Sequence, residues 1–245
     1  MLYQNVSFNF KNKTVLITGG SKGIGKGLCK AFLNSGSKVF YVSRKPINNK
    51  DYNKAIHIAA DLRNDTDIKN IFSLIDKEAS LDILINSAAI NFSKKFDKIK
   101  KDEWNEVINI NLSSIFSICK EALMRMKKRK NGKIVNISSI AGRHRSYVAG
   151  AHYVASKSGL IGLTKQLAFE SAKYNINVNA VCPSQTLTPM LKKSMNQSQI
   201  NKLIKNIPLN RLATVKDQLA TIMFLCSDGA EYITGTYIDV NGGQI

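Results

Sequence analysis

Residues 13–27 read KTVLITGGSKGIGKG, and this stretch decides the fold. Its apolar start predicts a short buried strand over Lys13–Thr18. Closely spaced glycines then predict a tight turn, after which apolar residues recur at helical spacing until Gly36 stops the helix. A strand that turns sharply through glycines into a helix is the opening half of a β-α-β unit.

The rest of the chain repeats this alternation of short apolar strands and amphipathic helices. Further strands are expected at 38–43, 55–60, 81–89, 132–139, 176–183 and 235–243, and helices at 65–79, 101–130, 152–173 and 216–227. Strands separated by helices predict a parallel sheet that is covered by helices on both faces. About seven strands suit a single doubly wound α/β domain over residues 1–245. The segment 184–210 has weak helical character and is the expected substrate-loop region.

The chain is strongly basic, with 36 Lys and Arg residues against 17 Asp and Glu residues and a formal net charge of +19. Such a charge attracts anions such as nucleotides, nucleic acids, acidic proteins or phospholipid surfaces. A compositional bias toward Lys, Asn and Ile along the whole chain is the simpler explanation. Because we find no basic tail, helix-turn-helix pattern or RNA-binding aromatic motif, we do not expect a nucleic-acid partner.

The cysteines and the apolar runs indicate the cellular compartment of the protein. Cys29, Cys119, Cys182 and Cys226 are far apart and form no C-x-x-C pair, so we expect buried thiols in a reducing cytoplasm. No cluster has metal-ligand spacing. No apolar run approaches the roughly 18 residues of a membrane span, and the N-terminus lacks the apolar core of a signal peptide. We therefore expect a cytoplasmic protein without a membrane partner.

The glycine turn after the first strand suits a phosphate group. Glycine lets the backbone approach a pyrophosphate closely, and the following helix offers free N–H groups and a partial positive charge. The spacing is G-x-x-x-G-x-G, and a tight turn without a ligand is the alternative. The candidate cofactor residues here are Gly19, Ser21, Lys22, Gly23, Ile24 and Gly25.

The ends of the next two strands indicate which dinucleotide binds. An acidic residue after the second strand usually binds the ribose 2′-hydroxyl of NAD, whereas a basic residue suits a 2′-phosphate. Ser43 and Arg44 occupy that place, so we expect NADP(H), with Arg44 and Lys22 on the phosphate. Ordinary solvated cations are the alternative. Asp61, followed by Leu62, is equally suited to bind the adenine amino group or to cap the next helix.

The stretch HYVASKSGL places Tyr153 and Lys157 one helical turn apart, on the same side of a helix. A phenol ionises poorly at neutral pH. An ammonium about 4 Å away is worth roughly 4 kcal/mol at an effective dielectric near 20, or about three pH units of pKa. We therefore expect Lys157 to lower the pKa of Tyr153 toward neutrality, where a general acid works best. A pair of surface side chains is the alternative for an isolated Y-x-x-x-K.

Taken together, these motifs resemble the short-chain dehydrogenase/reductase family over essentially the whole chain. The matching stretches are TGGSKGIG (18–25), DL (61–62), NSAA (86–89), INLSSIF (110–116), NISS (136–139), YVASK (153–157), CPSQTLT (182–188) and ITGTYIDVNGG (233–243). The resemblance implies a Rossmann-like fold. It is greatest to the β-ketoacyl-acyl-carrier-protein reductases and to related sugar and polyol dehydrogenases.

The resemblance also implies roles for individual residues. Tyr153 aligns with the catalytic acid, Lys157 with its activating lysine, which also holds the nicotinamide ribose, Ser139 with the substrate-orienting serine, and Asn111 with the asparagine of a proton relay. Asn86 aligns with a residue beside the adenosine ribose and the sheet. Further cofactor contacts are expected from Pro183, Thr186 and Thr188. The chain departs from the family at Ser184, where glycine is usual, and in the 14 positions between Ser139 and Tyr153, where 13 is typical.

The lead hypothesis is NADPH-dependent reduction of a ketone, with a 3-oxoacyl thioester on acyl carrier protein as substrate. The alternatives are a sugar, polyol or other small-ketone dehydrogenase and, more remotely, a nucleotide-binding protein without turnover. Tyr147, Val148, Leu187, Met190, Leu191 and Met195 offer apolar surface for an acyl chain.

The family resemblance places carrier docking near the cations of Arg125–Lys133 and near Lys173. Complementation of helix dipoles is the alternative explanation for these cations. The resemblance also implies a homo-oligomer, either a dimer or a tetramer.

Overall fold

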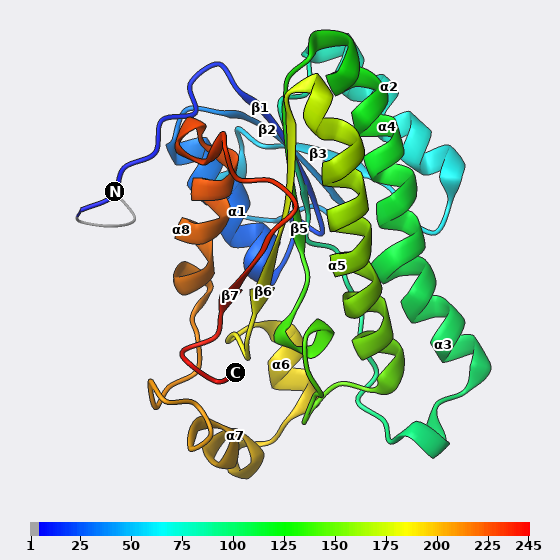
Figure 1. Ribbon diagram of the computed structural model, residues 1–245, viewed down its shortest axis with the longest axis vertical. Coiled ribbons are helices and arrows are strands. Elements are labelled where there is room, and N and C mark those ends of the chain that lie inside the picture. The colour runs from blue at the N-terminus through cyan, green and yellow to red at the C-terminus, as the bar shows by residue number, and fades with distance from the viewer. Residues whose placement is uncertain (1–4) are drawn as a thin grey trace.

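The computed structural model of the protein describes residues 5–245, so the first four residues of the N-terminal segment examined for a signal peptide lie outside the described residues. Seven parallel strands form one sheet in the order β3-β2-β1-β4-β5-β6-β7 (Figure 1). The strands are β1 Thr14–Thr18, β2 Lys38–Ser43, β3 Ile56–Ala59, β4 Ile83–Asn86, β5 Gly132–Ile137, β6 Ile176–Pro183 and β7 Tyr237–Val240. This confirms the predicted doubly wound sheet. The strand order reverses between β1 and β4, the place where such sheets bind ligands.

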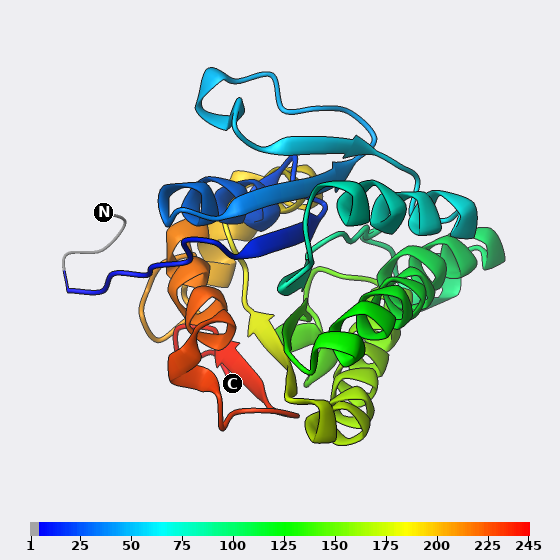
Figure 2. The same ribbon diagram turned by 90° about the horizontal axis from the view of Figure 1, so that it is seen from above.

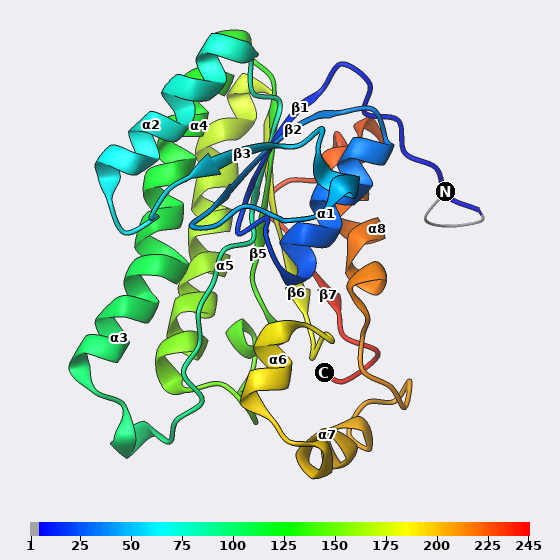
Figure 3. The same ribbon diagram turned by 180° about the vertical axis from the view of Figure 1, so that it is seen from behind.

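Helices cover both faces of the sheet, as the alternating pattern predicted (Figures 1 and 3). One face carries α1 (Gly23–Asn34) and α8 (Val215–Cys226), and the other carries α2 (Asp65–Glu78), α4 (Ser114–Arg129) and α5 (Ala151–Ser171). Figure 2 shows the sheet from above, between these two layers. Each layer buries its own apolar cluster against the strands.

The helix predicted over 101–130 is interrupted by a wider turn. It consists of α3 (Lys101–Ile108), a π-helical turn over Asn109–Ser113, and α4. Periodicity did not reveal this turn, because α3 and α4 each keep regular helical spacing on their own side of it. Such turns often lie at functional sites, and this one contains the site candidate Asn111.

The weakly helical segment 184–210 forms two short helices beyond the carboxyl ends of the strands, α6 (Pro189–Ser194) and α7 (Gln197–Ile204). Thr188 caps α6, and Asn196 begins α7 with a capping box. A small separate core holds them in place, made of Leu191, Leu203, Ile207 and Leu212. These two helices lie near the carboxyl ends of the strands, on the same side of the sheet as the glycine turn that follows β1 (Figure 3).

All four cysteines are buried and unpaired, as expected. The helical stretch Lys101–Arg129 is long and apolar enough to cross a bilayer by length and composition alone, which the search for apolar runs did not anticipate. This is weak evidence for a membrane span, because the core helix of a globular protein meets the same criterion. Here 44% of the apolar window is buried inside the protein.

Candidate active site

The glycine turn between β1 and α1 is built for close approach. Gly19 has φ +67°, and a Cβ there would lie 2.7 Å from the Cα of Ala88 in the loop after β4. Gly23 has φ +53°, and a Cβ there would lie 3.2 Å from Cγ2 of Thr188, at the start of α6. Positive φ and the absence of space both favour glycine. The turn therefore brings the ends of β1 and β4 and the start of α6 together.

The N-terminus of α1 is uncapped among the described residues, because its N-cap residue Lys22 makes no side-chain cap bond and its first turn holds no acidic residue. By contrast, Asn64 caps α2 and Thr214 caps α8. Free N–H groups at a helix start, beside glycines that leave space, fit the pyrophosphate of a dinucleotide. Gly19, Ser21, Gly23 and the first N–H groups of α1 would hold it.

The adenosine end of the predicted site carries cations. Arg44 and Lys22 are both exposed. Asp61 accepts an ion-paired hydrogen bond from Arg63, which together with weaker effects, including the charge of Arg44, lowers the pKa of Asp61 to about 2. Asn64 rather than Asp61 caps α2, so the helix-cap alternative for Asp61 is wrong. Its role toward adenine stays a prediction.

Asn86 is fully buried at the end of β4. Its Nδ2 donates to Oδ1 of Asn136 at 2.9 Å, and Asn136 in turn donates to Thr164 at 2.9 Å. This chain of amides links β4, β5 and α5 inside the molecule. The expected place of Asn86 in the sheet is confirmed, but the structure leaves it no exposed surface for contact with a cofactor.

Ser139, Tyr153 and Lys157 meet at the carboxyl end of β5. Ser139 begins the turn Ile140–Gly142, and its hydroxyl group is hydrogen-bonded to Tyr153. Lys157 is 2% exposed, and its Nζ donates to the carbonyl of Ile137 at 2.7 Å and lies 5.6 Å from the ring centroid of Tyr153. The three candidates therefore lie together, although β5 and α5 contribute them from different parts of the chain.

The expected lowering of the Tyr153 pKa is wrong for this structure. Loss of solvent around the hydroxyl raises the pKa of Tyr153 to about 12, and the hydrogen bond with Ser139 offsets this only in part. Burial also lowers the pKa of Lys157 to about 8. The prediction took only the attraction between the two groups into account. The structure shows that the ammonium is engaged with Ile137 and that burial favours the neutral form of each group.

Asn111 lies in the π-helical turn and is fully buried. Its side chain bonds both main-chain groups of Ile90, accepting from the N–H at 2.9 Å and donating to the carbonyl at 2.9 Å. Its Nδ2 also lies 3.1 Å from Oγ of Ser156, which donates to the carbonyl of Tyr153. Asn111 thus ties the loop after β4 to α5, the helix that carries Tyr153 and Lys157.

Two serines of this network were missed by sequence reasoning. Ser156 joins Asn111 to Tyr153, and Ser138 donates to the carbonyl of Lys157 at 2.9 Å. Their only sequence signal is small size beside the candidate residues. The departure at Ser184 causes no backbone strain, because among the described non-glycine residues the positive φ angles are those of Asn12, Lys130, Asn175 and Asn210.

The strand end before α6 is partly enclosed. The hydroxyl of Thr186 is 3.2 Å from Nε2 of Gln218, and Thr186 is buried. Thr188 faces the glycine turn as described above, and Pro183 ends β6. Of these three predicted cofactor residues, Thr188 is therefore the one whose side chain lies against the glycine turn.

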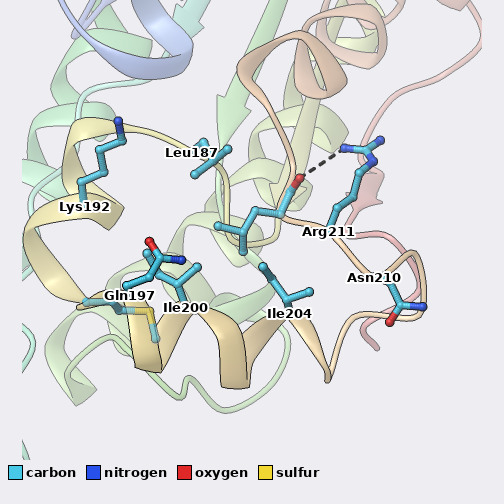
Figure 4. A pocket seen from close by; sticks show the side chains of 9 residues that line it. Leu187, Lys192, Gln197, Ile200, Ile204, Asn210 and Arg211 are labelled. Carbon is cyan, nitrogen blue, oxygen red and sulfur yellow. Dashed lines mark hydrogen bonds between the residues drawn. The ribbon is translucent and has the colours of Figure 1, made fainter.

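A cavity of about 500 Å³ lies between α6, α7 and residues 210–212 (Figure 4). Its lining is mainly apolar, with Leu187, Met195, Ile200, Ile204 and Leu212, and polar groups come from Lys192, Gln197, Asn210 and Arg211. Of the apolar residues predicted for an acyl chain, Leu187 and Met195 line this cavity and Leu191 belongs to the buried core beneath it. Tyr147, Val148 and Met190 do not line it. Within the described residues, the lining includes none of Ser139, Tyr153 and Lys157.

Comparison with known proteins agrees with this geometry. Residues 13–199 match the family described as short chain dehydrogenase. The chain belongs to this family. It is 37% identical over 239 residues to the 3-oxoacyl-(acyl-carrier-protein) reductase of Buchnera aphidicola subsp. Baizongia pistaciae, covering 95% of this chain and 97% of the relative. The recognised resemblance is thereby confirmed.

Solved structures of two kinds superpose on this short-chain dehydrogenase. One is the 3-ketoacyl-(acyl-carrier-protein) reductase of Brucella melitensis complexed with NADH, with a TM-score of 0.89, 29% identity and coverage of 96% of this chain and 99% of that one. The other is the aldohexose dehydrogenase of Thermoplasma acidophilum, with a TM-score of 0.88, 31% identity and coverage of 96% and 94%. The chain is therefore an oxidoreductase that interconverts carbonyl and alcohol groups with a nicotinamide cofactor.

Proposed function

We propose that this dehydrogenase works as a reductase, with NADPH as cofactor and a 3-oxoacyl thioester as substrate. The observation that supports carbonyl reduction is that Ser139, Tyr153 and Lys157 lie together at the carboxyl end of β5. The protonated phenol of Tyr153 can give its proton to a carbonyl oxygen, which reduction requires. The bound nicotinamide supplies the hydride in this chemistry. Tyr153 then donates its proton to the carbonyl oxygen, and Ser139 stabilises the charge that develops there.

The choice of NADPH rests on charge at the adenosine end. No carboxylate stands at Ser43 or Arg44, where NAD-binding folds usually have one. The nearest candidate, Asp61, is already paired with Arg63. Arg44 and Lys22 are exposed and suited to a 2′-phosphate. Because a related reductase is complexed with NADH, this assignment rests on these residues alone.

The substrate assignment rests on the relatives named above and on the apolar cavity. Leu187 of that cavity directly precedes Thr188, which lies against the glycine turn, so the cavity is next to the turn to which we assign the cofactor. Its five apolar side chains suit an acyl chain better than a sugar, whose hydroxyls require polar partners. The likeness to the aldohexose dehydrogenase favours a sugar as the second candidate substrate.

The surface expected to dock a carrier protein needs correction. Of the cations in Arg125–Lys133, Arg125 is paired with Asp76 and Glu121, and Arg129 is paired with Asp82. Lys133 is 8% exposed and donates to Asn177. These three side chains hold elements of this chain together, so they are not free to bind an acidic partner.

We place the carrier on the part of that surface that stays free, a patch formed by Lys127, Phe169, Glu170, Lys173 and Tyr174 at the adjoining ends of α4 and α5. Because Tyr153 lies at the opposite end of α5, the carrier would deliver its substrate across a subunit boundary. The ring of Tyr174 lies between two ammonium groups, 5.0 Å from that of Lys127 and 5.4 Å from that of Lys173. Phe169 beside them is 82% exposed. An exposed aromatic ring among cations suits an acidic protein that also offers an apolar side chain.

Two measurements test this proposal. Reduced-nicotinamide consumption is first compared for an acetoacetyl thioester and for a panel of ketoses. Turnover of ketoses alone would refute the thioester assignment and support the sugar alternative. Lys173→Glu is then expected to lower kcat/KM for carrier-bound substrate severalfold, in a salt-dependent way, and to leave a small thioester unaffected. Lys69→Glu, an equal charge change on exposed α2, is the control.

A homo-oligomer and a cytoplasmic location complete the proposal. The outer face of α4 exposes two large apolar side chains, Phe116 and Met124, by 55% and 46% respectively. Exposed apolar side chains of this size are typical of an interface between subunits. Light scattering of the purified protein tests this, and a monomer at micromolar concentration would contradict it.

A further inference from the structure

The turn that carries Ser139 is held firmly on its α5 side. The carbonyl of Ser139 accepts from Gly142 at 2.9 Å, and its Oγ accepts from the N–H of Ala141 at 3.1 Å. Ser158 of α5 donates to the carbonyl of Gly142 at 2.9 Å. A Cβ on Gly142 would lie 2.6 Å from the carbonyl carbon of Lys157, so the turn packs directly on the catalytic helix.

The other side of the same turn is held by an ion pair with the edge strand. Arg143, the residue after the turn, pairs through its NH1 with Oδ2 of Asp239 in β7. Its guanidinium also lies 4.6 Å from the ring centroid of Tyr237, and Lys165 lies 5.2 Å from the same ring. The second carboxylate oxygen, Oδ1 of Asp239, is buried and has no hydrogen-bond partner among the described residues. Arg143 is therefore the main partner of this carboxylate.

The strand register shows what this pair spans. Ser138, directly before Ser139, donates its N–H to Val181 of β6 at 2.8 Å. The next residue of β6, Cys182, is the register partner of Asp239. Arg143 thus crosses the end of β6 and connects the turn after β5 to β7. Among the described residues, no other hydrogen bond or ion pair joins this turn to β7.

We propose that Arg143 and Asp239 are positioning residues that fix the turn of Ser139 against Tyr153. This inference rests on the proposed function, because it takes Ser139 as the group that stabilises the reacting carbonyl. The longer spacing between Ser139 and Tyr153 makes a second anchor useful, since a longer connection allows the turn more freedom. A hydroxyl displaced by a fraction of an ångström loses much of its value to a developing charge.

The test uses Arg143→Gln with Arg125→Gln as a matched control. Arg125 likewise pairs with carboxylates and lies 4.9 Å from an aromatic ring, that of Phe72, but it holds α2 to α4. Arg143→Gln is expected to lower kcat about tenfold with the dissociation constant of NADPH unchanged. Arg143→Lys, which keeps the charge without the planar group, should recover part of the loss. Equal kcat in Arg143→Gln and wild type would overturn the proposal.

Hydrogen–deuterium exchange supplies a readout that does not depend on turnover. Amides of residues 140–143 should exchange severalfold faster in Arg143→Gln and in Asp239→Asn, and at the wild-type rate in Arg125→Gln. If wild type turns over no thioester, the proposed function fails while exchange still tests the pair. Unchanged exchange in both variants would refute the positioning role, whatever the substrate.

Discussion

Replacing Lys157 by methionine should stabilise the protein at neutral pH while it abolishes turnover. Burial lowers the pKa of Lys157 from 10.5 to about 8, so the folded protein carries a cost for keeping this ammonium charged. A difference of about 2.5 pH units corresponds to about 3 kcal/mol. Methionine removes that cost but also the hydrogen bond from the charged amine to Ile137, worth about 2 kcal/mol. The net gain is about 1 kcal/mol, or roughly 2–4 °C in Tm for a domain of this size.

The sign of the effect sets the pH window. Below pH 8 the lysine is protonated in both the folded and the unfolded state, so the full cost is present in wild type. Between about pH 8 and 10.5 the unfolded chain binds a proton that the folded protein does not, and the free energy of unfolding therefore rises with pH. The advantage of Lys157→Met should shrink across that window. The titration of Tyr153 lowers the free energy of unfolding as pH rises, but only above pH 10, because the pKa of Tyr153 is raised from 10.0 to about 12 on folding.

The assay is thermal unfolding of cofactor-free protein at pH 7 and at about pH 9.5, just below the range in which tyrosine titrates. Lys69→Met, on an exposed part of α2, is the control and should leave Tm almost unchanged at both pH values. A Tm of Lys157→Met at or below that of wild type at pH 7 would refute the reasoning. So would a stabilisation of equal size at both pH values.

Three further predictions concern the pH dependence of the rate, the choice of cofactor, and the stability that Asn111 gives to the loop after β4. Reductase kcat should fall above about pH 8 as Lys157 loses its proton, which a pH–rate profile checks, and a flat profile to pH 10 would contradict this role. Arg44→Asp should weaken NADPH binding by about tenfold or more and leave NADH binding unchanged or stronger, as measured by fluorescence titration. Equal effects on the two cofactors would count against a contact between Arg44 and the 2′-phosphate. Asn111→Ala leaves both main-chain groups of Ile90 unpaired, so unfolding should become easier by about 2 kcal/mol in a urea titration, and a loss below about 0.5 kcal/mol would refute this account.

The sequence sufficed for the sheet because its signals are local. Apolar runs, glycines and helical spacing predicted all seven strands, and the family motifs brought Ser139, Tyr153 and Lys157 together correctly. The features that it did not predict depend on neighbours distant in sequence. Arg129 was expected at a docking surface, but its partner Asp82 lies 47 positions away.

The prediction that the pKa of Tyr153 is lowered was wrong for the same reason. Spacing along the helix gave the right partner, but the degree of burial depends on the whole fold. Asn111 in the π-helical turn likewise bonds to Ile90, 21 positions away, a contact that local propensity does not predict. Sequence reasoning is therefore strongest for elements and weakest for the electrostatics of the groups that they bring together.

The most direct test of the account is Tyr153→Phe, assayed with NADPH and an acetoacetyl thioester beside a binding titration of NADPH. Phenylalanine keeps the ring next to Lys157 and removes only the hydroxyl bonded to Ser139. The account predicts a dissociation constant for NADPH close to that of wild type and a kcat reduced by a factor on the order of 10² or more. Turnover close to the wild-type rate would contradict the claim that Tyr153 is the proton donor.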